Sequence, residues 1–472
     1  MWAFAVPLLM AKMFTSLLPS SLFSTVSQIA CVIFGSYVGG WIDHYNRLRL
    51  QQIALIVQNA SVVSSFVLLI ILQHNFIGAT RIDPVWSSPL FNLLFFGAIL
   101  LGAVAAVASM ITSISISKEW IVVIQKAHPH MPLTKVNATF RRIDLACKLL
   151  SPLAFALILR LTSLTASLII VTSWNAISLI PESLLTQLLY RRIPELGVPK
   201  SPEAMRGKSP NPLAQIASGW RAYFSQPIFR SSLAYVLLYM TVLSPGGVMT
   251  AFLEFRNMNE LVIAAFTGLG ALVGLVSTFI TPHLIQKLSL RRTGLFALWA
   301  QSSMLIFALA PFFFTTSPII LLPIAIALSR FGLWAFDLVE VELMQTYVPD
   351  AERGTVSGVE YSMTNLISVG AYAMGVVIPD PKDFVYLVIA SLVFVAAAMI
   401  IYTWWFTKPP RAILNIEAAL ARGETITSVH TVDLQPLEDD KRRASIEILE
   451  LEEPQSSAIT SIRLEPIQEE EK

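Results

Sequence analysis

Charged side chains are scarce in this sequence. Only 14% of its 472 residues are charged and 55% are hydrophobic, whereas about 25% of the residues in soluble domains are charged. A soluble protein of this length needs polar side chains to cover its surface, so the composition excludes an ordinary soluble enzyme. The net charge of +2 also argues against nucleic-acid binding. We therefore expect a chain that lies mostly in lipid.

Cysteine is rare too, and the common catalytic motifs are missing. Cys31 and Cys147 lie in separate apolar segments without a CxxC spacing, which indicates inert buried thiols. The sequence has no P-loop, no HExxH and no nucleophile elbow. Neither ATP-driven transport nor hydrolysis is supported, and we expect a protein that is not an enzyme.

Long apolar runs make up most of what is present. Because backbone groups in lipid must be bonded within a helix, each sufficiently long run predicts a membrane helix. We predict an all-α polytopic membrane protein with twelve transmembrane helices in two six-helix lobes. The predicted spans are residues 1–18, 20–41, 50–73, 90–117, 140–160, 164–190, 230–252, 260–286, 293–313, 317–346, 354–378 and 384–406.

The loops indicate the orientation and the division of the chain. Basic residues concentrate in alternate loops, and such loops stay in the cytoplasm, so both termini are expected there. Proline-rich residues 191–229 predict a cytosolic linker between an N-terminal lobe, residues 1–190, and a C-terminal lobe, residues 230–406. The polar, acidic residues 407–472 predict a disordered cytosolic tail. Whether the membrane is the plasma membrane or that of an organelle does not follow from these patterns.

Charges near the ends of spans predict contacts between the lobes. Asp43 and Arg47 follow the second span in a loop that resembles the signature loop of the major facilitator superfamily, where paired charges at helix ends can latch the cytosolic side. A loop that only sets topology is the alternative. Further charges could form a gate or could snorkel at the interface, and a local ion-pair ladder would explain part of the cluster in the fifth span. They are Arg141, Arg142, Asp144 and Lys148 in the fifth span, and Asp350, Glu352 and Arg353 before the eleventh.

Polar residues within the spans are candidate cation ligands, because their burial in lipid is costly. Gln58 and Asn59 in the third span, and Asn175 and Glu182 in the sixth, offer oxygen donors that suit a hard cation. Hydrogen bonding between helices is an equally good interpretation. The tenth span carries Arg330, Asp337, Glu340 and Glu342. Its three carboxylates indicate a cation or proton role, with intramembrane charge pairing as the alternative.

In this order, the segments of the chain resemble the ferroportin family, solute carrier family 40. The resemblance implies a major facilitator fold that exports ferrous iron, or a divalent metal, from the cytosol by alternating access. It also implies a monomer without a resident cofactor, apart from calcium in the N-terminal lobe. The matching segments include Gly40–Asp43 with Arg47-Leu48, Val57–Asn59, Glu119–Val123, Asn137–Thr139 with Arg141–Asp144, Trp174-Asn175, Leu238–Leu243, Arg292–Leu295, Gly332–Trp334 with Phe336–Leu338, and Glu352–Gly354.

The resemblance also assigns expected roles to particular residues. The cytosolic gate of the family would fall on Asp43, Arg47, Arg142, Asp144, Asp350 and Arg353. A calcium site would use Gln58, Asn59, Asn175 and Glu182.

The metal ligands of the family are not matched. Their positions here are Ala3, Gly247 and Ala371, and side chains without a donor atom cannot bind a metal. The start of the chain within an apolar segment favours native residues that precede Met1, although these would not restore Gly247 or Ala371. Iron could instead be bound by other groups such as Glu340. Otherwise the protein is a facilitator of another small solute or cation, or a scaffold that does not transport.

Overall fold

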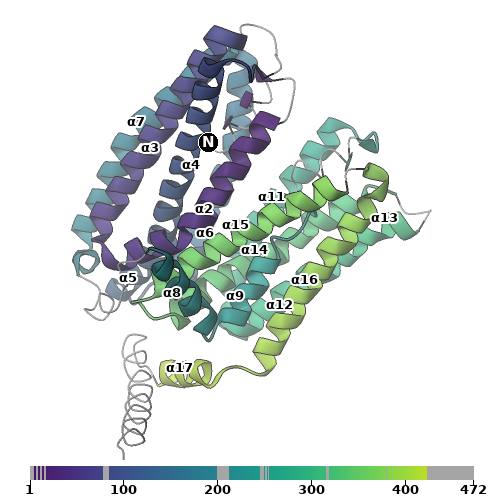
Figure 1. The fold of residues 1–472 in the computed structure, drawn as a ribbon. Helices are drawn as coiled ribbons and strands as arrows, with labels where there is room; N and C mark the ends of the chain where they lie inside the picture. Colours follow the sequence, from purple (N-terminus) through teal and green to yellow (C-terminus); the bar gives the residue numbers. More distant parts are fainter. Residues whose placement is uncertain are drawn as a thin grey trace, which may run out of the picture. The chain divides into compact units, whose positions relative to one another are not determined.

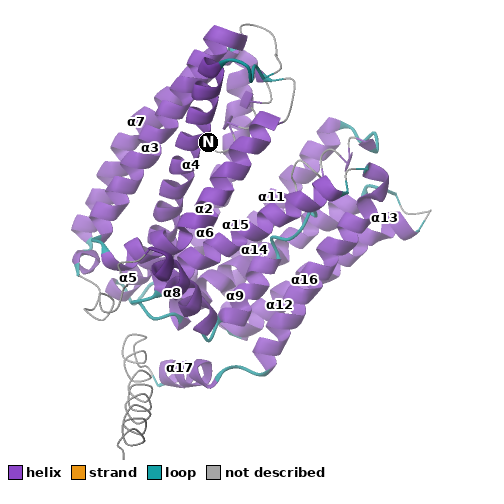
Figure 2. Ribbon diagram, viewed as in Figure 1, coloured by secondary structure: helices purple, strands orange, loops and turns teal. Residues whose placement is uncertain are grey.

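The computed structural model describes most of the chain as helix. The described residues are 18–77, 84–198, 212–244, 255–314, 318–378 and 380–422, with the isolated positions 5, 6, 9, 10, 13, 14, 249, 252 and 253. Figure 2 shows helices joined by loops throughout these parts, and no strand. The all-α prediction is confirmed.

The helices keep the labels of Figure 1. The elements of the N-terminal half, up to residue 198, are α2 Leu18–His44, α3 Arg47–Leu72, η1 Gln73–Ile77, α4 Pro89–Ile114, η2 Ser115–Trp120, α5 Ile121–Ala127, α6 Leu133–Leu161, α7 Leu164–Arg192 and η3 Pro194–Gly197. Those of the C-terminal half, from residue 212, are α8 Pro212–Ser225, α9 Phe229–Leu237, α11 Glu260–Leu288, α12 Leu290–Ile306, η5 Phe307–Leu309, α13 Ala310–Phe313, α14 Leu321–Tyr347, α15 Arg353–Val377, η6 Pro381–Asp383, α16 Phe384–Thr407 and α17 Arg411–Ala421.

Within the described parts of the chain, eight helical stretches are long and apolar enough to cross a membrane. They coincide with the predicted spans two, three, four, six, eight, nine, ten and twelve. The fifth and eleventh predicted spans, α6 and α15, are helices of 29 and 25 residues with a more polar composition. The first predicted span lies mostly outside the described residues.

The seventh predicted span, residues 230–252, departs from the prediction. Helix α9 ends at Leu237, and residues 238–244 form turns and bends. Pro245 and the two glycines after it account for the non-helical backbone near Ser244, because proline restricts the preceding residue to extended backbone. A continuous helix over residues 230–252 was therefore a wrong prediction for residues 238–244.

Short polar side chains begin several of the long helices. Asn46 accepts from the backbone nitrogens of Leu48 and Arg49 at 3.1 Å each and caps α3. Ser88 and Ser163 cap α4 and α7 in the same manner. Because such caps satisfy the first free N–H groups of a helix, they fix where each membrane helix starts.

Apolar faces hold each half together. In the N-terminal half α3 packs against α4 and α7, and in the C-terminal half α14 packs against α11 and α12 (Figure 1). Phe66, Phe91 and Phe95 are among the fully buried side chains of the N-terminal core. The core of each half is therefore built mostly from its own helices.

The two halves meet where α2 crosses α15, and this crossing depends on glycine. A Cβ on Gly358 would overlap the carbonyl oxygen of Gly35, and a Cβ on Gly39 would overlap that of Gly354. Backbones can approach this closely only where side chains are missing. Helices α6 and α11 form a second contact between the halves.

The end of the chain forms a separate unit, Asn415–Lys472. Within the predicted tail, residues 407–472, the structure contains the short helix α17. Residues 423–472 lie outside the described residues, so their disorder stays a prediction.

Candidate functional site

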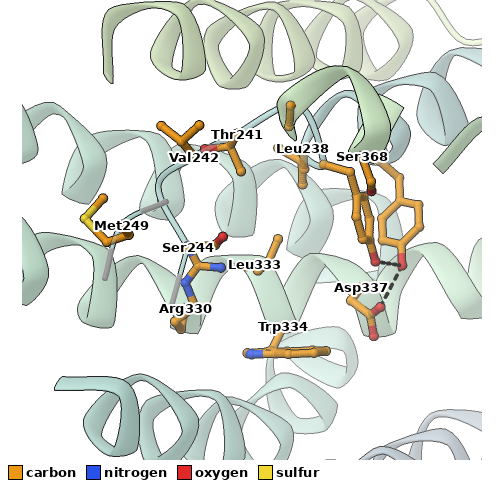
Figure 3. A pocket seen from close by; sticks show the side chains of 13 residues that line it. Leu238, Thr241, Val242, Ser244, Met249, Arg330, Leu333, Trp334, Asp337 and Ser368 are labelled. Carbon is orange, nitrogen blue, oxygen red and sulfur yellow. Dashed lines mark hydrogen bonds between the residues drawn. The ribbon is translucent and has the colours of Figure 1, made fainter. Parts of the chain in front are cut away.

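A cavity of about 280 Å³ lies between α14, α15 and the irregular segment that follows α9. Its polar and aromatic lining includes Tyr235, Tyr239, Arg330, Trp334 and Asp337, of which Figure 3 labels the last three. A larger cavity of about 580 Å³ shares the two tyrosines, Trp334 and Asp337 with it and extends to residues of the N-terminal half. Asp337 therefore lies where the two cavities adjoin.

Asp337 is held by both halves of the protein. Tyr235 donates to its Oδ1 at 2.9 Å, and Tyr239 in turn bonds to the Tyr235 hydroxyl at 2.9 Å (Figure 3). The guanidinium of Arg141, on α6, forms an ion pair with its Oδ2. Arg141 also donates to Asp144 at 3.0 Å. It therefore has a second carboxylate partner when it leaves Asp337.

Arg330 does not pair with Asp337, although both lie on one face of α14. Its guanidinium donates to the carbonyl oxygens of Leu243 and Ile326. Leu243 belongs to the segment that left helical geometry, so its carbonyl lacks the usual helical donor. Arg330 thus stabilises the irregular segment that forms one wall of the smaller cavity.

The three carboxylates of α14 bind three different partners. Asp337 pairs with Arg141, Glu340 accepts from Ser231 at 2.7 Å, and Glu342 accepts from Thr134 at 2.6 Å. Glu340 lines neither cavity. Among the described residues, no three His, Cys, Asp or Glu side chains are grouped to hold a metal ion. Asp337 and Glu340 therefore do not face a common cavity, and a cation site shared by the two stays a prediction.

Asp43, a predicted gate residue, caps a helix of the other half. Its carboxylate accepts from the backbone nitrogens of Gly354 at 2.9 Å and Thr355 at 2.7 Å, and from the Thr355 hydroxyl at 2.6 Å. These groups form the N-terminus of α15, where a negative charge is favoured. Besides any basic partner, the carboxylate thus binds the helix end itself.

The other predicted gate residues divide between inter-half and local contacts. Arg142 donates to the carbonyl oxygen of Thr278 at 3.0 Å and stacks on Phe279, both on α11. Arg47 bonds to loop carbonyls after α7, within its own half. Asp144 pairs with Arg141 and Lys148 of its own helix. Asp144 and Arg353, which could have paired between the halves, belong to separate networks.

Asp350 joins the halves from the loop between α14 and α15. It pairs with Lys126 of α5 at 2.7 Å and with Arg353, and Arg353 also donates to the carbonyl oxygens of Gln345 and Val348. Burial opposes ionisation of Asp350, but Arg353 and Lys126 outweigh it and hold its pKa well below the usual range. A depressed pKa means that the pair loses its charge only in strong acid.

We expect Lys126→Met to reduce transport only slightly. The side chains of Lys126 and Asp350 are 33% and 40% exposed, and exposed ion pairs contribute at most about 1 kcal/mol, or roughly fivefold in an equilibrium. The initial rate of transport by the Lys126→Met variant in reconstituted vesicles, compared with that of the unchanged protein, tests this. A loss of transport as large as that caused by a buried inter-half residue would contradict the surface assignment.

The predicted calcium ligands lie on two packed helices, α3 and α7. Asn59 and Asn175 are buried, and each donates its amide to a carbonyl of its own helix. Gln58 is half-buried and Glu182 exposed. The side-chain amides of Asn59 and Asn175 therefore bond within their own helices, and a calcium site between α3 and α7 stays a prediction.

The metal-ligand positions of the family bring no donor into the described cavity. Ala371 lines the smaller cavity with a methyl group only. Ala3 and Gly247 lie outside the described residues. Cys147 is exposed and lines the larger cavity, so the prediction of a buried thiol at this position was wrong.

Two buried charges were missed by the sequence reasoning. Lys118 of η2 pairs with Glu360 of α15 at 3.3 Å, and both side chains are nearly inaccessible. Glu360 could have been found by the same rule that selected Asp337, because it too lies within a predicted span. Lys118 could not, because it lies just beyond the predicted fourth span, residues 90–117, and its π-helical turn is not visible in the apolar pattern.

Comparisons with known proteins place this arrangement in a family. The family model described as Ferroportin1 (FPN1) matches residues 1–395. Solute carrier family 40 member 1 of Oryza sativa subsp. japonica is 30% identical over 442 residues, which cover 89% of this chain and 90% of the relative.

Solved structures are similar to this chain as well. An outward-facing structure of a bacterial homologue of the iron transporter ferroportin is 28% identical, with a TM-score of 0.74 over 86% of this chain and 95% of that chain. Its inward-facing state gives 27% identity and a TM-score of 0.58, over 86% and 94%. The proton:xylose symporter XylE, 15% identical, supports the major facilitator fold alone, with a TM-score of 0.56 over 83% and 86%. Since the family model covers most of the sequence, this chain belongs to the ferroportin family.

Proposed function

We propose that this protein exports ferrous iron across a membrane by alternating access. The observation that carries the proposal is Asp337, a carboxylate in a cavity that is held by a guanidinium from the other half. The iron transporters among the relatives supply the substrate class. A single chain contains both halves, so we propose a monomeric carrier.

The contacts between the halves identify what must break in the cycle. Asp43 on the α15 N-terminus, Arg141 on Asp337, and the glycine crossing of α2 and α15 all join the halves in this structure. The outward-facing homologue fits this arrangement better than the inward-facing one. Separation of the halves at these contacts would open the cavity to the side of the membrane that the contacts now close.

The basic loops support the direction of export. They lie at the ends of α2, α5 and α6 where Asp43 and Lys126 contact the C-terminal half. If positive loops are cytoplasmic, the contacts described here close the cytosolic side, and iron enters the cavity when they open.

Iron binding would start at Asp337. A divalent cation competes with Arg141 for this carboxylate, and Arg141 keeps Asp144 as a partner when displaced. The hydroxyls of Tyr235 and Tyr239 supply neutral oxygens next to it. Carboxylate and hydroxyl oxygens suit a hard or borderline divalent ion.

Efflux from vesicles tests the proposal. The full chain is reconstituted in liposomes that contain ascorbate, ferrous iron and calcein, whose fluorescence iron quenches. We expect recovery of fluorescence well above that of protein-free liposomes, because iron leaves through the carrier. Recovery equal to that of empty membranes would contradict iron transport.

A second candidate function follows from Ala371. Because this position gives the cavity a methyl group where the family has a metal ligand, the selectivity for iron is open to change. The same vesicles, loaded in turn with Mn²⁺, Co²⁺, Zn²⁺ or a quaternary ammonium ion, separate the two functions. Faster efflux of another ion than of iron would favour a facilitator of that ion.

A further inference from the structure

Glu340 and Glu360 form a buried acidic pair that the proposed iron path does not use. They lie on α14 and α15, with exposed fractions of 0% and 5%. The adjacent serines Ser231 and Ser232 of α9 each donate to one of them, both at 2.7 Å. The two carboxylates are therefore held next to each other by two consecutive residues.

One basic side chain serves this pair, and it comes from the other half. Lys118 bonds to Glu360 Oε1 at 3.3 Å. Among the described residues nothing donates to Glu340 Oε1, although this atom is buried. Two carboxylates and one ammonium leave a charge of −1, which is costly to bury without a further cation.

A proton fits the missing charge better than a metal ion does. Glu340 lines neither of the two cavities described above, so neither cavity gives a hydrated ion access to it. The neighbouring serine hydroxyls point their hydrogens at the carboxylates, and a metal needs several oxygens that point inward. A proton needs no volume and converts the unpartnered oxygen into part of a neutral acid.

We propose that Glu340 and Glu360 form a proton-binding site, and that Lys118 makes the number of bound protons depend on whether the two halves touch. While Lys118 neutralises Glu360, one proton on Glu340 leaves the cluster neutral. When the halves separate here, Lys118 leaves with the N-terminal half and Glu360 needs a proton of its own. Separation thus takes up about one proton, and closure releases it to the larger cavity, which Glu360 and Lys118 line.

The π-helical turn η2 makes this contact possible. It inserts between α4 and α5 and places Lys118 and Glu119 among the buried residues. A π-turn adds one residue to a helix turn and redirects the side chains that follow. Lys118 of this turn thereby reaches Glu360 of the other half.

Other ionisable groups near the pair are accounted for. Asp337, Tyr223 and Tyr239 interact with Glu340 or Glu360. Tyrosine does not titrate near neutral pH, but Asp337 would lose Arg141 on separation just as Glu360 would lose Lys118. At the start of α15, burial raises the pKa of Glu352. Glu342, which joins the halves through Thr134, Asp337 and Glu352 are the carboxylates that the experiment must separate from Glu360.

Distance measurements at different pH test the site. Spin labels are placed at Tyr45→Cys and Lys287→Cys, one exposed position in each half, in a full chain with Cys31→Ala and Cys147→Ala. Double electron–electron resonance is recorded in nanodiscs with chelator between pH 5.5 and 8.5. We expect the separated population to grow as pH falls, by up to about tenfold in the equilibrium per pH unit.

The variants assign the proton. Glu360→Gln and Lys118→Met should each remove the pH response, whereas Asp337→Asn, Glu342→Gln, Glu352→Gln and Lys126→Met should keep it. Glu340→Gln should also keep it, because it imitates the acid that stays protonated. If Glu360→Gln does not fold, Lys118→Met decides alone. A response that survives in Lys118→Met, or that is lost in Glu352→Gln, overturns the proposal.

The inference rests on the alternating-access cycle of the proposed function, but not on iron. The distance experiment contains no metal, so its result is independent of the vesicle assay. A pH response without iron efflux would contradict the proposed cargo and keep the proton site. Iron efflux without the pH response would support the proposed cargo and contradict the proton site.

Discussion

Gly358→Leu is expected to reduce transport by roughly 100-fold. Even the first carbon of a side chain at this position would overlap the carbonyl oxygen of Gly35, and a backbone oxygen cannot rotate away. Overpacking of this kind costs up to about 3 kcal/mol, which here disfavours only the state in which α2 and α15 touch. The halves would then remain separated at this end. Iron efflux from vesicles and the distance between the halves measure the two effects.

A matched glycine provides the control. Gly268 lies on α11, and a Cβ there meets nothing within 4 Å. Gly268→Leu adds the same side chain to a membrane helix and should leave transport nearly unchanged. Gly358→Ala should fall between the two. Equal losses for Gly268→Leu and Gly358→Leu would mean that added bulk, rather than the α2–α15 crossing, limits transport.

Asp337→Asn is expected to lower iron transport at least tenfold, mainly through a higher KM. The change removes the negative charge next to the cavity but keeps the size of the side chain, so the loss reports on cation binding. Hydrogen bonds and ion pairs to charged groups contribute about 1.5–3 kcal/mol, which corresponds to a tenfold or larger change in affinity. Efflux rates over a range of iron concentrations provide KM and kcat.

Arg141→Gln supplies the opposite test. It removes the cation that competes for Asp337, so iron should bind more tightly and KM should fall. The rate should fall too, because the contact between the halves is lost. A KM that rises in both variants would place the iron site elsewhere in the cavities.

Much of the fold could be predicted because lipid leaves few choices. The apolar runs gave the positions of α2, α3, α4 and α16 within a few residues, since a membrane helix must bond its own backbone. The interruption after Leu237 was also signalled, by Pro245 and the glycines beside it. Hydrophobicity alone overrode that signal and predicted a helix through it.

The site was predicted less well, because its contacts join residues far apart in the chain. The sequence marked Asp43 at the end of a span and Asp337 within a span as candidate functional charges. The contact of Asp43 with the α15 N-terminus and that of Asp337 with Arg141 depend on how the halves pack. Lys118 and Glu360 are 242 residues apart. No local pattern encodes such a pair, and the π-turn at Lys118 changes the helical phase without a trace in the composition.

The irregular segment after α9 has a consequence for how the protein is made. Helix α9 has nine residues and rises about 14 Å, whereas the hydrocarbon core is about 30 Å thick. In the irregular segment after α9, the carbonyl of Leu243 accepts a hydrogen bond from Arg330, 87 residues later in the chain. The Leu243 carbonyl is therefore satisfied only once Arg330 of α14 is present. We therefore expect the segment after α9 to reach its final conformation together with α14 rather than before it.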